Sequence, residues 1–173
     1  MKTTTIWTRQ TYRAIMISVL SMLFLGAPVA FAQGADGGEL GEQTYNTVCL
    51  ACHQMTGLGL PAVFPPLVEH APELLAYEGN REYIAKLILY GLQGEVTILG
   101  QAYNQLMTPH EAILSNEQLA AVVNYVMHAW GNDALLPEAY EPFVPEDFEA
   151  FRGLGLTAQD VYALRLELGI GAE

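Results

Sequence analysis

The chain has 173 residues and a formal net charge of −12, with 19 acidic residues against seven basic ones, and 51% of its residues are hydrophobic. This length fits one domain with a tail and is short for two domains of ordinary size. The acidic balance argues against nucleic acid and anionic lipid as partners and favours basic protein partners.

The first 32 residues have the three-part pattern of a secretory signal. Basic residues come first, an apolar run from Ala14 to Leu25 follows, and Ala30-Phe-Ala32 supplies a cleavage motif of small residues. A retained membrane anchor is the alternative, because residues 14–32 approach the roughly 20 uncharged residues that a span needs. Gly26 and Pro28 interrupt the run, so we expect cleavage and a periplasmic or otherwise exported protein. A retained signal would add membrane association.

Cleavage would make the mature chain more acidic than its precursor. It removes three of the seven basic residues and no acid, which leaves four basic residues against nineteen acids, a net charge of −15. Such a surface would steer the protein toward basic partners. Solubility, or adaptation to a salty habitat, explains the acidic surface equally well.

A helix is the first element predicted in the mature chain. Residues 33–38 are polar and glycine-rich and indicate a flexible lead-in. From Glu39 to Val48 the apolar residues are spaced toward one face, which predicts a helix that runs directly into Cys49.

Cys49-Leu-Ala-Cys52-His53 is a C-x-x-C-H motif, whose spacing suits the attachment of haem c. Two thiols must reach the two vinyl groups on one edge of the porphyrin, while the adjacent imidazole reaches the iron. A thioredoxin-like dithiol would need a βαβ context, and half of a zinc site would need further ligands at a recognisable spacing. The motif therefore predicts one covalent haem, with Cys49 and Cys52 as attachment points and His53 as iron ligand.

A loop, a short helix around 72–77 and two longer helices are predicted after this motif. Met55–Leu67 is glycine-rich and apolar, and its three prolines exclude a regular helix, so it indicates a loop that covers an apolar group such as haem. Apolar residues recur at three and four residue intervals over 80–92 and again over 119–126. Ser115 with Gln118 forms a capping-box pattern before the second helix. No internal repeat and no convincing strand pair is recognisable.

An iron bound to one imidazole either needs or deliberately lacks a sixth ligand. The residues that could supply it are Met55, Met107, Met127, His70, His110 and His128. Met107 is favoured because it lies in a predicted loop well separated from His53, and a thioether stabilises ferrous iron, as suits an electron carrier. His110 is its rival, and an ordinary core methionine is a further alternative. His70, His110 and His128 are otherwise interpreted as surface or structural histidines.

An acidic tail follows Asn132, and its only basic residues are Arg152 and Arg165. A short helix is predicted over 145–151. Thr157-Ala-Gln-Asp160 has the pattern of a second helix start. The mature fold is therefore predicted to be mostly helical.

On these residues the chain resembles a class I monohaem cytochrome c, over roughly Gly38 to Asn132. Gly41 and Tyr45 stand where this family has a small residue and an aromatic that let its first and last helices cross. Tyr125 stands where the last helix supplies its own aromatic. The resemblance implies an all-α fold, the class I cytochrome c fold, with helices wrapped around one covalently attached haem.

The resemblance also implies roles for residues around the haem. Pro65 would offer its carbonyl to His53, and Leu67 would pack on the haem. Met107 with Pro109 matches the distal-ligand loop of the family, although the family more often has proline directly after the methionine. The chain would then comprise a signal peptide at 1–32, a cytochrome c domain at 33–132 and an acidic C-terminal helical extension at 133–173.

The stretch from Leu87 to Met107 resembles a bacterial subgroup whose members serve beside quinoprotein dehydrogenases and copper nitrite reductases. A Tyr-Asn pair before the distal methionine recurs in that subgroup, which implies a place near the haem for Tyr103. A core role for this tyrosine is equally compatible with the sequence. A segment of the tail that ends at Arg165 is also similar to that subgroup, but an acidic insertion separates it from Asn132.

We expect an electron-transfer haem protein that is not an enzyme, with redox partners such as a dehydrogenase, a reductase or a terminal oxidase. A fixed cytochrome subunit of a larger complex and a haem enzyme with a labile sixth ligand are the alternatives. The apolar residues hypothesised to form a docking rim, unless they merely pack on the haem, are Met55, Leu58, Leu60 and Leu106. Besides the haem iron, no metal site is predicted, because the acids are scattered.

Overall fold

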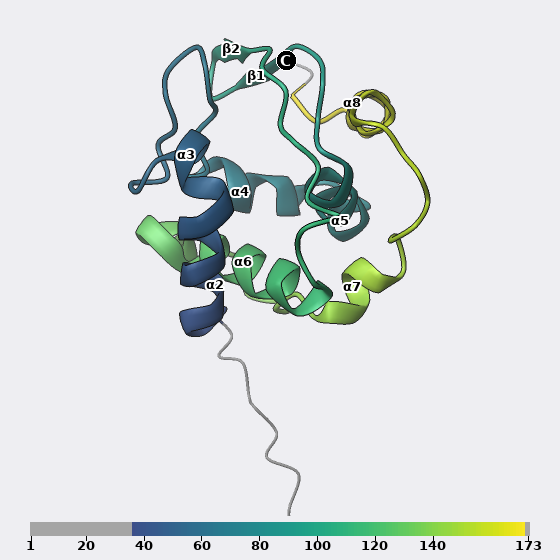
Figure 1. Cartoon of the computed structure of the whole chain (residues 1–173). Helices are drawn as coiled ribbons and strands as arrows, with labels where there is room; N and C mark the ends of the chain where they lie inside the picture. Colours follow the sequence, from purple (N-terminus) through teal and green to yellow (C-terminus); the bar gives the residue numbers. More distant parts are fainter. Residues whose placement is uncertain (1–35, 172–173) are drawn as a thin grey trace, which may run out of the picture. The chain divides into compact units, whose positions relative to one another are not determined.

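The first helical segment of the structure, a computed structural model that describes residues 36–171, carries the C-x-x-C-H motif (Figure 1). It consists of α2 (Gly38–Thr44), a π-helical turn (Tyr45–Cys49) and α3 (Leu50–His53). The helix predicted to run into Cys49 is thereby confirmed. The predicted signal at 1–32 lies outside the described residues.

An extended loop follows and leads to α4 (His70–Glu73), a 3₁₀ turn (Leu74–Ala76) and α5 (Asn80–Tyr90). Gly91 ends α5 with φ of 77°, a conformation that favours glycine. A β-carbon at Gly91 would lie 2.2 Å from the Met107 carbonyl oxygen, so glycine also lets the Met107 loop lie against this helix end.

A short antiparallel hairpin, β1 (Val96–Ile98) and β2 (Gln101–Tyr103), contradicts the expectation of no strand pair. Val96 lies opposite Tyr103, and Ile98 lies opposite Gln101. The two turn residues, Leu99 and Gly100, have φ of 49° and 75°. Tight hairpin turns need such positive φ values, and leucine at the first turn position conceals the usual Asn-Gly or Asp-Gly signal.

The longest helix, α6 (Asn116–His128), begins at the predicted capping box. The Ser115 hydroxyl accepts from the Gln118 backbone N–H at 3.3 Å, and the Gln118 side chain accepts from the Ser115 N–H at 3.0 Å. A 3₁₀ segment (Ala129–Leu135), α7 (Pro145–Glu149) and α8 (Ala158–Glu167) follow. Both helices predicted in the tail are confirmed.

Helices α2 and α6 cross at a contact that depends on Gly41. A β-carbon at Gly41 would lie 2.3 Å from the Ala121 carbonyl oxygen and 2.8 Å from the β-carbon of Tyr125. The rings of Tyr45 and Tyr125 pack beside this contact, with centroids 5.5 Å apart. The crossing that the family resemblance implied is confirmed.

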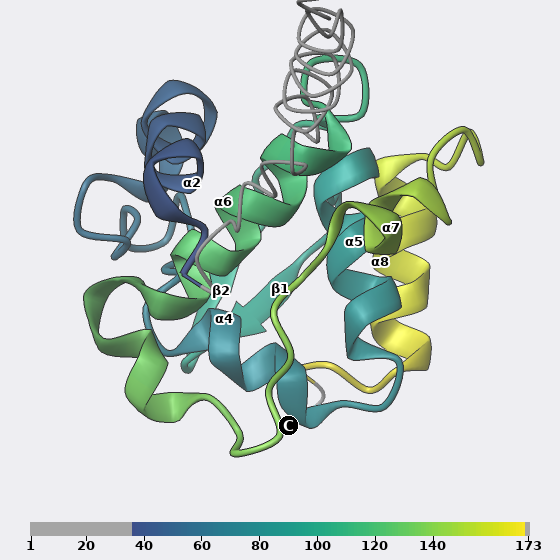
Figure 2. The same ribbon diagram turned by 90° about the horizontal axis from the view of Figure 1, so that it is seen from below.

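One hydrophobic core joins α5 and α6 to both tail helices. Its fully buried members include Tyr83 and Leu89 of α5, Leu119 of α6, Phe148 of α7 and Val161 of α8. Figure 2 shows α7 and α8 beside α5. The acidic tail thus completes the core, and the boundary between a domain at 33–132 and an extension at 133–173 stays a prediction. No helix within residues 36–171 is both long and apolar enough to cross a membrane.

Candidate functional site

A largely apolar cavity lies at the centre of the described fold, with about 1400 Å³ of space free of protein atoms, part of it open to solvent. Its walls come from α3, the following loop, α4, α5, the hairpin, the Met107 loop, α6 and α8. The size and apolar walls of this cavity suit a large, flat, mostly apolar group.

Cys49 and Cys52 stand one helical turn apart at the cavity wall, both free and partly buried. Burial, with Cys52 nearby as a second cause, raises the pKa of the Cys49 thiol to about 12. Redox-active dithiols need the opposite, a lowered pKa that makes a thiolate available. The environment therefore argues against a thioredoxin-like dithiol.

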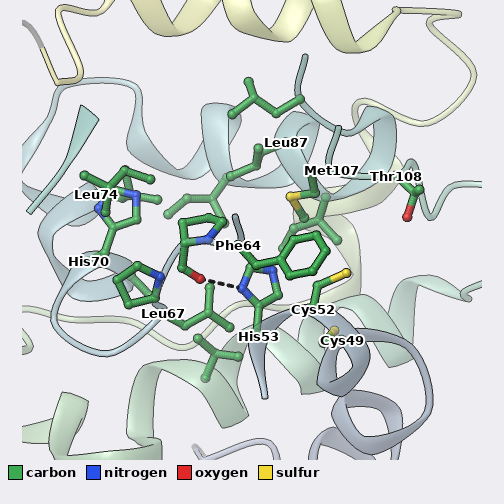
Figure 3. A pocket seen from close by; sticks show the side chains of 18 of the residues that line it. Cys49, Cys52, His53, Phe64, Leu67, His70, Leu74, Leu87, Met107 and Thr108 are labelled. Carbon is green, nitrogen blue, oxygen red and sulfur yellow. Dashed lines mark hydrogen bonds between the residues drawn. The ribbon is translucent and has the colours of Figure 1, made fainter. Parts of the chain in front are cut away.

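His53 is held by the hydrogen bond that the family resemblance implied. Its Nδ1 donates to the Pro65 carbonyl oxygen at 3.0 Å (dashed line in Figure 3), which leaves Nε2 for a metal. Burial lowers the pKa of His53 against the opposing effect of the Pro65 bond, and so favours the neutral imidazole that binds metals. A β-carbon at Gly59 would lie 2.5 Å from the Pro65 carbonyl oxygen, so only glycine fits behind this bond.

Three aromatic side chains hold the loop that follows His53. The Tyr45 hydroxyl donates to the Gln54 carbonyl at 2.6 Å, and the Trp130 indole N–H donates to the Met55 carbonyl at 3.0 Å. The Trp130 ring packs against those of Tyr45 and Tyr125, with centroids 5.1 Å and 5.8 Å away. Sequence reasoning did not single out Trp130, and the glycine-rich loop it covers was the available signal.

Met107 reaches the same cavity from another segment. Its backbone forms a two-bond bridge with Leu92 just after α5, with N–H to O distances of 3.0 and 3.1 Å. Figure 3 shows the Met107 side chain above His53 and Cys52. Met107 is partly buried and lines the cavity, so the fold brings together the imidazole, both thiols and the thioether.

The remaining predicted site residues also line the cavity. Leu67 is partly buried, with its carbonyl bonded to the Asn132 side chain at 3.2 Å, and Tyr103 is buried on the hairpin. Of the residues hypothesised to form the docking rim, one lines the cavity and three do not. Met55, Leu58 and Leu60 are exposed and do not line the cavity, whereas Leu106 is exposed at its edge.

Two histidines and an arginine also line the cavity. His70 and His110 are buried and line the cavity, so neither is a surface residue, whereas the partly buried His128 bonds the Asn124 carbonyl. Arg165 of α8 is buried at the same cavity. A basic residue set among the apolar positions of the tail helix was the signal for Arg165.

The donor set fits a haem rather than a bare metal ion. Within residues 36–171, no three His, Cys, Asp or Glu side chains are placed to hold a metal ion together. The cavity instead offers two thiols, one oriented imidazole, one thioether and apolar walls. These groups would suit covalent attachment of a haem and ligation of its iron.

Comparisons with known proteins agree with this assignment. The model of the cytochrome c family matches residues 38–130. Cytochrome c-552 of Thermus thermophilus is 42% identical over 153 residues, which cover 88% of this chain and 97% of that protein. The cytochrome c subunit of alcohol dehydrogenase (quinone) from Gluconacetobacter polyoxogenes is 31% identical over 104 residues, 60% of this chain and 21% of that protein.

Proposed function

The chain belongs to the cytochrome c family and is an electron-transfer haem protein with covalently bound haem c, and we propose that it shuttles single electrons between exported or membrane-bound redox proteins. When bound, the haem supplies an iron that cycles between Fe(II) and Fe(III). One observation carries the proposal: the Cys49–His53 motif and the Met107 loop meet at one apolar cavity, with His53 already oriented by Pro65.

The site residues have distinct proposed roles. Cys49 and Cys52 would bind the haem covalently, and His53 would ligate the iron. The Pro65 carbonyl would keep the His53 ring in one orientation in both oxidation states, because the hydrogen bond fixes its tautomer. An unchanged ligand geometry lets the electron move with little rearrangement of the protein.

Met107 is proposed as the sixth ligand, with Leu67 and Tyr103 as packing residues that exclude water from the haem. The Leu92 bridge fixes the Met107 backbone at the cavity. His110 is the rival ligand, since it lines the same cavity and its Nδ1 has no hydrogen-bond partner within residues 36–171. A thioether would raise the reduction potential relative to an imidazole.

Ferric absorption spectra test the sixth ligand. We expect a methionine-sulfur-to-iron charge-transfer band that disappears in Met107→Ala and persists in Met55→Ala, since Met55 is 76% exposed and does not line the cavity. A band that persists in both variants would exclude Met107 as the ligand. A wild-type spectrum without the band that changes in His110→Ala would assign His110 instead. A high-spin ferric haem in the wild type would favour catalysis.

A fixed cytochrome subunit of a larger oxidoreductase is the second candidate function. Similarity to the cytochrome c subunits of quinone alcohol dehydrogenases favours it. Purification from the native host at native expression level separates the two. A shuttle would purify alone, whereas a subunit would copurify with a dehydrogenase or reductase. If the signal is cleaved, the intact mass should be that of a chain that begins at Gln33.

A further inference from the structure

The acidic tail places a buried cation in the cavity wall. Arg165 of α8 is 2% exposed, and its Nη1 donates to the Tyr83 hydroxyl at 3.0 Å. Its Nη2 is buried and has no hydrogen-bond partner within residues 36–171. A guanidinium with an unused donor in an apolar cavity requires a partner, because an uncompensated buried charge is strongly destabilising.

The other three lysine and arginine side chains within residues 36–171 have carboxylate, amide or carbonyl partners. Arg81 pairs with Asp147 at 2.5 Å, and Lys86 pairs with Glu82. Arg152 donates to the Asn116 side chain and to the carbonyls of Glu111 and Leu114, at 2.5 to 2.8 Å. Of the four lysine and arginine side chains within residues 36–171, only Arg165 combines burial, an unused donor and a place at the cavity.

Within residues 36–171, no carboxylate pairs with Arg165. Burial raises the pKa of Tyr83, which keeps its hydroxyl neutral. Burial lowers the pKa of His70, and the nearby charge of Arg165 acts in the same direction. Glu73 already accepts from the His70 Nδ1 at 2.9 Å. An anion inside the cavity would therefore supply the missing partner of Nη2.

The acidic edge of a haem bound here would lie at the end of the cavity away from both cysteines. Covalent attachment fixes the vinyl edge at Cys49 and Cys52, and the two propionates extend from the opposite edge of the porphyrin. In Figure 3, His70 lies at the opposite end of the labelled group from both cysteines, and Arg165 acts electrostatically on His70.

We propose that Arg165 binds a propionate carboxylate of the haem, so that the tail helix is part of the cofactor site. The inference rests on the proposed haem attachment. A guanidinium suits this role because its fork of donors matches a carboxylate and stays charged in an apolar setting. The tail then sets the reduction potential, since an unpaired propionate charge stabilises Fe(III) and a paired one does not.

Reduction potentials of the full chain with haem attached test the proposal. In Arg165→Met the ferrous-to-ferric ratio at a fixed ambient potential should fall on the order of tenfold, about 59 mV for a one-electron couple. Arg165→Lys should retain most of the wild-type value. Arg152→Met is the matched control, because it removes another tail cation that does not line the cavity, and should leave the potential near that of the wild type.

Redox-induced infrared difference spectra identify the anion. With haem labelled with ¹³C at the propionate carboxyls, a labelled band should shift between wild type and Arg165→Met. Identical bands and potentials in both proteins would overturn the proposal. Gly171 lies near Nη2, so Glu173→Gln with two glycines added after position 173 tests whether a carboxylate of the last residues is the partner instead. A potential lowered as in Arg165→Met would establish that and overturn propionate binding.

Covalent haem attachment distinguishes a failure of the proposed function from a failure of the role proposed for Arg165. The pyridine haemochrome spectrum of each purified variant measures covalent haem. A wild-type chain that carries no covalent haem would refute the proposed function itself. Haem attached in every variant, with an unchanged potential in Arg165→Met, would refute only the role of Arg165.

Discussion

Asn124 links α6 to the tail through three side-chain hydrogen bonds. Its Nδ2 donates to the Phe143 carbonyl at 2.9 Å, and its Oδ1 accepts from the Phe143 N–H at 2.8 Å. The Tyr140 hydroxyl also donates to Oδ1, at 3.1 Å. The Asn124 side chain thus bonds both backbone polar groups of Phe143, as a neighbouring backbone segment would.

Replacing Asn124 with leucine should lower the free energy of unfolding by about 2–4 kcal/mol, because both polar groups of Phe143 lose their partner while buried. Denaturant unfolding followed by circular dichroism measures this loss. Asn46, exposed on the π-helical turn, is the control, and its replacement with leucine should change stability by under about 0.5 kcal/mol. Equal effects at the two sites would contradict this role of Asn124.

The raised pKa of Tyr140 predicts that the protein loses stability at high pH. Burial raises the pKa of its hydroxyl to about 12, above the ordinary value near 10. A raised pKa in the folded state means that the contribution of this group is complete below about pH 10 and is lost as pH rises toward 12. Stability measured from pH 9 to 12 should therefore fall less steeply in Tyr140→Phe. Parallel curves for the two proteins would rule out this contribution.

Around the haem site, residues in local motifs were predictable and residues brought in by the tail were not. Cys49, Cys52 and His53 share one motif, and the Pro65 contact followed from family resemblance. His70 and His110 are polar residues whose burial depends on distant elements, so the sequence favoured a surface or structural interpretation. Arg165 lies far along the chain, and its place at the cavity depends on how α8 packs on α5.

Among the elements, the crossing of α2 and α6 places the haem-attachment helix against the core. The carbonyl of Ala121 occupies the space where a side chain at Gly41 would lie. Because α2 leads directly into the C-x-x-C-H motif, this contact also positions Cys49 and Cys52 at the cavity.

Gly41→Ala should therefore destabilise the protein by about 1–3 kcal/mol through overpacking. The same substitution in an open helix stabilises by about 1 kcal/mol, so the crossing reverses the sign. Thermal and denaturant unfolding of the haem-loaded protein measure the effect. Glu42→Ala changes the adjacent exposed residue and should be nearly neutral. A stabilised Gly41→Ala would show that the helices do not approach this closely.

Elements with strong local signals were predictable from the sequence. The capping boxes at Ser115 and Thr157 predicted the starts of α6 and α8, and both bonds form at each. The hairpin was missed because each strand is only three residues long and leucine fills its first turn position. The π-helical turn at Tyr45–Cys49 has no compositional signature, since it differs from an α-helix only in hydrogen-bond register.

At the scale of the whole molecule, charge should govern encounter with redox partners. With the signal removed, the chain carries a net charge of −15. The exposed side chains of the hypothesised docking rim are apolar, with Met55 76% and Leu58 58% exposed, and among them Leu106 lies at the cavity edge. Long-range attraction would then come from the acidic surface and short-range contact from the rim.

The salt dependence of small-molecule electron transfer tests this steering. Reaction with cationic hexaammineruthenium should slow as ionic strength rises, because salt screens the attraction. Reaction with anionic ferricyanide should accelerate, because salt screens the repulsion. Stopped-flow rates from low to high salt measure both. Rates that are flat for both reagents would show that the negative charge does not steer encounter.

A redox titration of the purified, haem-loaded chain, followed by its visible spectrum, tests whether the protein is an electron carrier with fixed iron ligands. One covalent haem held by His53 and Met107 in both oxidation states predicts a single reversible one-electron transition. The spectra of the ferric and ferrous states should both be low-spin. A second wave, or a high-spin spectrum in either state, would contradict an electron carrier with fixed ligands.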